Sequence, residues 1–175
     1  MKHITLLALL ILAPFTLAQA GEHGLSTMTG PGIDLKVADH AFAGSIRDFV
    51  VWGNMDHDNF TSELLMKREG KVVRGTFSKE GEIRSGEGAA ERVTTMKFVK
   101  IVKPNESHEG KIILEINGET VEASIKADGF ENNHFLNPTY SATVGGKPVE
   151  FTLKGEACFG YSLHLLFMTL GAMVH

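Results

Sequence analysis

Three segments of the chain share one hairpin signature, and this repeat constrains the fold more than any other feature. They read REGKVVRGTFSK (68–79), INGETVEASIK (116–126) and VGGKPVEFTLK (144–154). In each, a glycine completes a two-residue turn of the kind that needs positive φ, and alternating apolar and polar residues follow it. Whether they arose by duplication or independently, the three segments predict tight antiparallel β-hairpins.

The rest of the chain up to Glu156 also shows short apolar runs and period-two alternation, which are typical of strands. Further strands are predicted within 33–52 and 91–103, while the Gly- and Glu-rich segment 78–91 is expected to be a solvated connection. The fold class is therefore mainly β. We expect an antiparallel β-sandwich or a partly closed meander barrel of about eight strands, with one C-terminal apolar helix packed on it.

The C-terminal segment, about 161–174, changes to helical periodicity. One face of the predicted helix carries His164, Met168, Gly171 and His175. The predicted helix is apolar on nearly all sides, which is typical of a buried element. A core helix is the first interpretation, and a face open to a metal ion or a protein partner is the alternative. A membrane anchor is not expected, because the stretch has about the minimum spanning length, contains His164 and lacks a following basic residue. The stripe expected to dock on the β-domain consists of Leu163, Leu166, Phe167, Leu170 and Val174.

The first residues of the chain, 1–20, have the layout of a secretory signal peptide, with a basic start, an apolar run and small residues at the end. Cleavage is expected after Ala20, which would place the mature protein in the periplasm or outside the cell. We expect residues 21–32 to form a flexible mature N-terminus, and residues 33–175 to form a single β-domain that includes the helix.

Charge and cysteine content narrow the classes of function. The chain has 17 basic and 21 acidic side chains, so nucleic acid is not an expected partner. Cys158 is the only cysteine, which excludes an intrachain disulfide, and we expect it to be a small buried apolar residue. The sequence contains no nucleophile elbow, HExxH or CxxC motif, so we expect binding rather than catalysis.

The C-terminal helix supplies the first candidate metal ligands. His164 and Met168 are one helical turn apart, and an imidazole with a thioether suits copper, with zinc as the alternative ion. The competing interpretation is a packed core, in which methionine commonly fills irregular gaps.

Three other places in the sequence supply further candidate metal ligands. Asp56 and His57 share one polar loop, for which a turn stabilised by its own Asp and Asn side chains is the alternative. His134 lies in a loop between aromatic residues, where a half-buried, hydrogen-bonded histidine is the alternative. His23 would be the third residue of the mature chain, an arrangement that chelates Cu(II) together with the terminal amine. The predicted copper or zinc site of a small exported binding protein takes its donors from His164 and Met168, supported by His57, Asp56 and His134. His23 would form a separate copper chelate at the mature N-terminus.

Two hypotheses compete with metal binding. A barrel closed by a helix would hold a small apolar ligand, as lipocalin-like barrels do, and this predicts an internal cavity of several hundred Å³. A protein-binding envelope module or inhibitor would instead act through exposed apolar surface on the helix. The aromatic residues expected to line the cavity are Trp52, Phe77, Phe98, Phe151 and Phe159.

Overall fold

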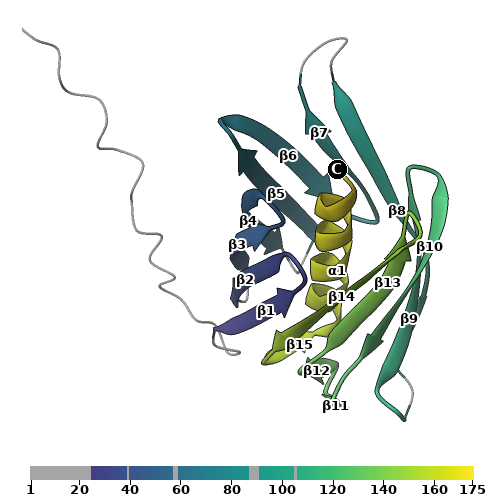
Figure 1. Cartoon of the computed structure of the whole chain (residues 1–175). Helices are drawn as coiled ribbons and strands as arrows, with labels where there is room; N and C mark the ends of the chain where they lie inside the picture. Colours follow the sequence, from purple (N-terminus) through teal and green to yellow (C-terminus); the bar gives the residue numbers. More distant parts are fainter. Residues whose placement is uncertain (1–24, 39, 57–58, 87–90, 105) are drawn as a thin grey trace, which may run out of the picture.

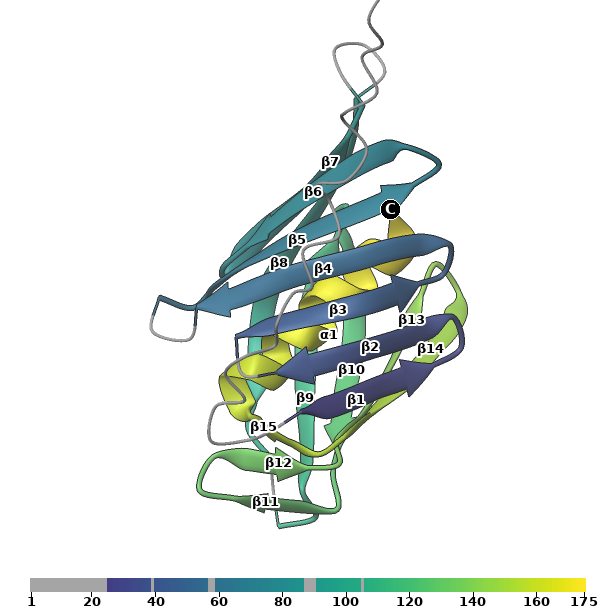
Figure 2. The same cartoon turned by 90° about the vertical axis from the view of Figure 1, so that its left-hand side faces the viewer.

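The computed structural model of the chain describes residues 25–38, 40–56, 59–86, 91–104 and 106–175. The predicted signal peptide, His23 and His57 lie outside these residues. Within them, twelve antiparallel strands close into a barrel, and the C-terminal helix runs through its interior (Figure 1; Figure 2). The mainly-β class with antiparallel strands and a C-terminal helix is confirmed.

The barrel strands follow one another mostly in sequence order. Around the barrel they are β1 (Ser26–Gly30), β2 (Ile33–Ala38), β3 (Ala41–Ile46), β4 (Phe49–Asp56), β5 (Thr61–Arg68), β6 (Lys71–Phe77), β7 (Glu80–Ser85), β8 (Arg92–Val102), β9 (Glu109–Ile116), β10 (Glu119–Lys126), β13 (Thr139–Val144) and β14 (Lys147–Lys154). Pairing of β14 with β1 closes the ring. A small separate sheet contains β11 (Gly129–Glu131), β12 (His134–Leu136) and β15 (Glu156–Cys158), and leads into α1 (Phe159–Val174).

The structure confirms all three predicted hairpins. They are β5–β6, β9–β10 and β13–β14, and each turns on two residues with positive φ. In the second of them, Asn117 has φ 51° and Gly118 has φ 81°. Two consecutive positive φ values match the twist of the flanking strands, which explains why the glycine-containing pairs predicted these turns.

Helix α1 is buried on all sides, because it lies inside the barrel rather than on its outer surface. Every residue from Tyr161 to Ala172 is buried, so both stripes distinguished in the sequence are buried except at their ends, where Val174 and His175 are half-buried. The Phe167 ring stacks on Phe98 of β8 at 4.3 Å between centroids and meets Phe77 of β6 at 5.4 Å. The core-helix interpretation is therefore confirmed, and a protein partner bound through this helix stays a prediction. None of the helices in the described ranges is long and apolar enough to span a membrane.

The expected strand number and sheet closure need correction. The barrel has twelve strands and is closed, so it is neither a sandwich nor a barrel of about eight strands. Two of the additional strands lie where the sequence predicts none: β1 within 21–32 and β7 within 78–91. Both strands are short, and each is paired on both sides in the folded barrel: β1 with β2 and β14, and β7 with β6 and β8. This pairing, and not the local sequence, makes them strands.

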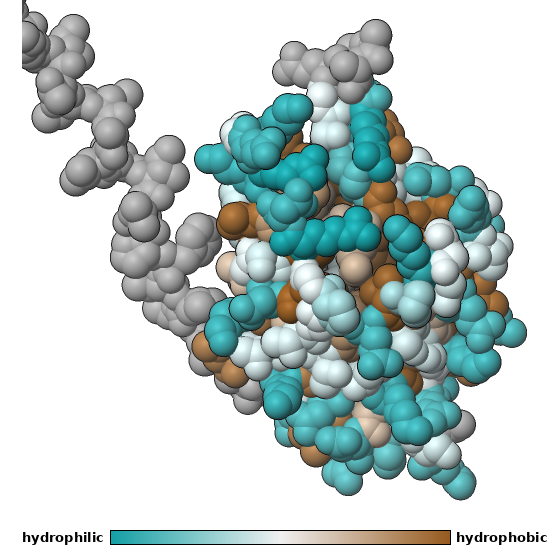
Figure 3. All heavy atoms as spheres, viewed as in Figure 1, coloured by the Kyte–Doolittle hydropathy of each residue, from teal (hydrophilic) through white to brown (hydrophobic). Residues whose placement is uncertain are grey.

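The inner and outer faces of the barrel differ sharply in polarity. Along β10 and β14, buried apolar residues alternate with exposed charged or polar ones. The face shown in Figure 3 accordingly carries many hydrophilic side chains with apolar ones scattered among them. The interior, where the lipocalin-like hypothesis expects a ligand, is occupied by α1. Of the predicted cavity-lining aromatics, Phe77 and Phe151 are buried in the core, whereas Trp52 lies on the outer side of β4.

Candidate ligand-binding site

A pocket of about 470 Å³ opens where α1 begins, at one end of the barrel. We call it the mouth pocket. Two of the aromatics predicted to line a cavity, Phe98 and Phe159, are in its wall. The residues that line it are Phe60, Lys79, Phe98, Val99, Lys100, Ile101, Phe159, Gly160 and Leu163.

A β-bulge in β8 shapes one wall of the mouth pocket. Phe98 pairs with Leu114 and Lys100 pairs with Ile113, so Val99 is the extra residue between them. A bulge bends its strand and changes the direction in which side chains point. Val99 is 51 % exposed as a result, while Phe98 still packs against the barrel core.

Aromatic contacts fix the opposite wall. Phe60 follows the β4–β5 connection with φ 49°, a conformation that is uncommon for a bulky residue. Its ring lies 6.2 Å from the ring of Phe98 and 4.2 Å from that of His164, measured between centroids. These contacts continue through Phe98 to Phe167 of the helix, so the pocket wall is part of the packed core.

The start of α1 closes the inner side of the pocket. Cys158 caps the helix, since its Sγ accepts a hydrogen bond from the Tyr161 backbone N–H at 3.3 Å. The N–H of Phe159 donates to the carbonyl of Asn133 at 2.9 Å, which ties the helix start to the β11–β12 turn. Gly160 leaves the space in front of Phe60 open, because a Cβ there would meet Cε2 of that ring only at 3.9 Å.

The mouth pocket combines an apolar lining with two positive charges. Lys79 and Lys100 are its charged lining residues, and no carboxylate is among the described residues that line it. The backbone carbonyl of Lys79 accepts from the N–H of Phe98 at 3.0 Å, which holds the β6–β7 turn against β8. Chemically, the site can bury an apolar group next to cations.

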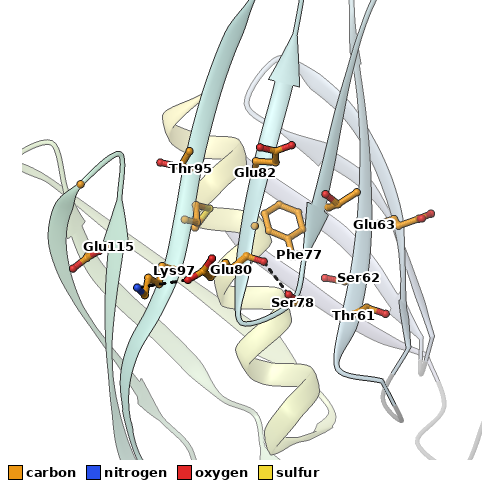
Figure 4. A pocket seen from close by; sticks show the side chains of 14 residues that line it. Thr61, Ser62, Glu63, Phe77, Ser78, Glu80, Glu82, Thr95, Lys97 and Glu115 are labelled. Atoms are coloured by element: carbon orange, nitrogen blue, oxygen red, sulfur yellow. Dashed lines mark hydrogen bonds and ion pairs between the residues drawn. The ribbon is translucent and has the colours of Figure 1, made fainter.

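A larger groove of about 880 Å³ lies on the outer face of β5 to β9 (Figure 4). Its charged lining residues include Glu63, Glu80, Glu82 and Glu115, and its lysine, Lys97, lies 3.5 Å from the carboxylate of Glu80. A hydrogen bond from the neighbouring Arg84 lowers the pKa of Glu82, so that carboxylate stays ionised. Its lining also includes the apolar side chains of Phe77 and Met96, so polar and apolar surface are mixed in the groove, whereas the lining of the mouth pocket is mainly apolar.

The predicted metal ligands do not gather in one place among the described residues. His164 is buried, and its Nδ1 lies 2.9 Å from Oγ of Ser62, while Met168 is buried one turn further along. Asp56 accepts from the backbone N–H of Asn59 at 3.1 Å and from its Nδ2 at 2.7 Å, as the turn alternative expects. His134 is on β12, with Nδ1 2.9 Å from the Asn132 carbonyl.

No group of three or more His, Cys, Asp or Glu side chains within the described ranges is arranged to hold a metal ion. Two of the predicted ligands, His23 and His57, lie outside those ranges. Copper or zinc binding stays a prediction, and elemental analysis of the purified protein tests it.

Comparison with known proteins gives no match: no family model, curated protein or solved structure is similar to this chain. The function must therefore be inferred from the site itself.

The mouth pocket cannot be predicted from the sequence alone, although two of its aromatics, Phe98 and Phe159, are among the residues expected to line a cavity. The pocket joins Phe60, Lys79, the bulge of β8 and Gly160, which are far apart along the chain. The one local signal was an aromatic residue, Phe60, at the end of a polar loop. Such a residue is typical of a loop that packs back on the core.

Proposed function

We propose that this chain is an exported binding protein that holds a small apolar ligand in the mouth pocket. The observation that carries the proposal is an open pocket of about 470 Å³ walled by Phe60, Phe98 and Phe159. Ligand pockets in proteins have volumes of roughly 300–1,000 Å³ and are lined mainly by apolar and aromatic side chains. Export is the prediction made from residues 1–20 and belongs to the same proposal.

The rigidity of the pocket wall supports the proposal. Phe98 is stacked on Phe167 and Phe159 packs near Phe135 at 5.9 Å between ring centroids, so both rings are held before a ligand arrives. A preformed site does not have to order its side chains on binding, and this lowers the entropic cost of association.

The test uses the neutral fluorescent probe N-phenylnaphthylamine, which becomes bright in apolar sites. We expect the protein to bind it, and Gly160→Leu to weaken binding about tenfold, because the new side chain fills the space in front of Phe60. Val72→Leu adds similar bulk at an exposed position on β6 and should leave binding unchanged. Absence of probe binding, or equal binding by folded Gly160→Leu, would contradict the proposal.

A further inference from the structure

Three lysines of the described barrel are paired with glutamates, but the two lysines of the mouth pocket are not. Lys97, Lys111 and Lys126 each lie within 3.5 Å of a glutamate carboxylate oxygen. Lys79 and Lys100 form no ion pair with any of the residues that the structure describes. In a chain with a formal net charge of −4, two cations beside one apolar pocket are a local reversal of the overall charge.

The start of α1 adds to this positive field. The helix has 16 residues, its first turn contains no acidic side chain, and Phe159 and Gly160 line the pocket. Backbone dipoles place a partial positive charge at the start of a helix, which favours an anion nearby. Lys79, Lys100 and the helix start therefore act in the same direction on whatever occupies the pocket.

We infer that the ligand is a monomeric anionic amphiphile of the fatty-acid class. Its alkyl chain lies between Phe60, Phe98 and Leu163, and its carboxylate lies at the rim near Lys79 and Lys100. The inference rests on the proposed function, because it assigns the chemical class of the ligand of the same pocket. The apolar wall explains the affinity for the alkyl chain of the ligand, and the two lysines explain the preference for a negatively charged head group.

The experiment is displacement of N-phenylnaphthylamine by three ligands with the same alkyl chain: laurate, dodecanol and dodecylamine. We expect laurate to displace the probe at about one-tenth of the dodecanol concentration, and dodecylamine to be the weakest competitor. The advantage of laurate should shrink as salt is added, because the rim is exposed to solvent.

The variant pair tests the assignment of the two lysines. Lys79→Gln combined with Lys100→Gln should bring laurate and dodecanol to within about threefold of each other, without changing probe binding. The matched control is Lys147→Gln combined with Lys154→Gln, which removes two charges from β14 and should preserve the laurate preference.

The outcomes separate the two proposals. If laurate and dodecanol compete equally with the native protein, the anionic ligand is excluded while apolar binding in the pocket stands. If the probe itself does not bind, both proposals fail. Sedimentation of the protein with phosphatidylglycerol vesicles, without displacement of the probe by laurate, would also overturn the inference, because it assigns the lysines to a lipid surface.

Discussion

Single residues hold α1 at a fixed height within the barrel through hydrogen bonds to the wall. His164 meets Ser62 near the start of the helix, and the Tyr161 hydroxyl donates to the carbonyl of Ala38. At the other end, Arg92 donates to the Val174 carbonyl at 2.9 Å. The bonds of His164 and Tyr161 satisfy polar groups that would otherwise be costly inside the apolar core, and the bond of Arg92 ties down the C-terminal end of the helix. Together they fix the position of the helix along the barrel.

His175 completes this set, and its titration should affect stability. Nδ1 lies 3.0 Å from Oγ1 of Thr94, and Nε2 lies 2.8 Å from Oγ of Ser85. Burial, and then the positive charge of Arg92, lower the pKa of His175 from its ordinary value of 6.5. The unfolded chain therefore binds the proton more tightly, so the stabilising contribution is complete above about pH 6.5 and is lost as the pH falls through the lower folded-state pKa.

The measurement compares urea unfolding of the native protein and His175→Gln between about pH 8 and about pH 5. We expect the free energy of unfolding to fall more steeply toward acid in the native protein, because glutamine keeps a polar side chain but does not titrate. Parallel pH profiles of the two proteins would show that His175 does not contribute to the pH dependence.

At the scale of elements, the packing of α1 against the barrel wall depends on a small residue at one point. A Cβ at Gly171 would lie 2.5 Å from Sδ of Met96 and 2.9 Å from Cδ1 of Ile83, whereas the space at Gly160 is open. Both glycines are in the same helix, so alanine improves the local helix propensity at each of them. Comparing alanine substitutions at Gly171 and Gly160 therefore separates the effect of the wall contact on stability from the effect of helix propensity.

We expect Gly171→Ala to lower the free energy of unfolding by about 1–2 kcal/mol, because overpacking exceeds the gain in helix propensity. Gly160→Ala should leave it unchanged or raise it by up to about 1 kcal/mol. Chemical denaturation of both variants measures the difference. Equal effects at the two sites would mean that the wall contact at Gly171 carries no cost.

The elements that can be predicted from the local sequence are those whose conformation is determined by residues close together in the chain. Gly70, Gly118 and Gly146 mark their hairpins because a two-residue turn requires positive φ at those positions. Strand β1 was not predicted, because it becomes a strand by pairing with β2 and with the distant β14. The mouth pocket depends on the same long-range closure, since Phe60 and Gly160 become neighbours only when α1 enters the barrel.

For the whole molecule, the number of strands and the central helix are linked. About eight strands enclose an interior that side chains alone can fill, and the interior widens as strands are added. Twelve strands therefore leave room that α1 occupies, and its apolar residues face inward-pointing apolar residues of the barrel such as Ile83 and Leu114. Neither part has a complete core without the other.

Unfolding of the helix and of the barrel should consequently be a single transition. Trp52, the only tryptophan, reports on β4 of the barrel wall, and far-UV circular dichroism reports on α1 together with the strands. We expect the urea midpoints from Trp52 fluorescence and from circular dichroism to coincide. If α1 left the interior, the apolar surfaces of both the helix and the inner face of the barrel would be exposed to water. In Gly171→Ala the two midpoints should move together to lower urea concentration. An earlier loss of the helical signal, with Trp52 fluorescence still native, would show instead that α1 leaves a barrel that remains folded.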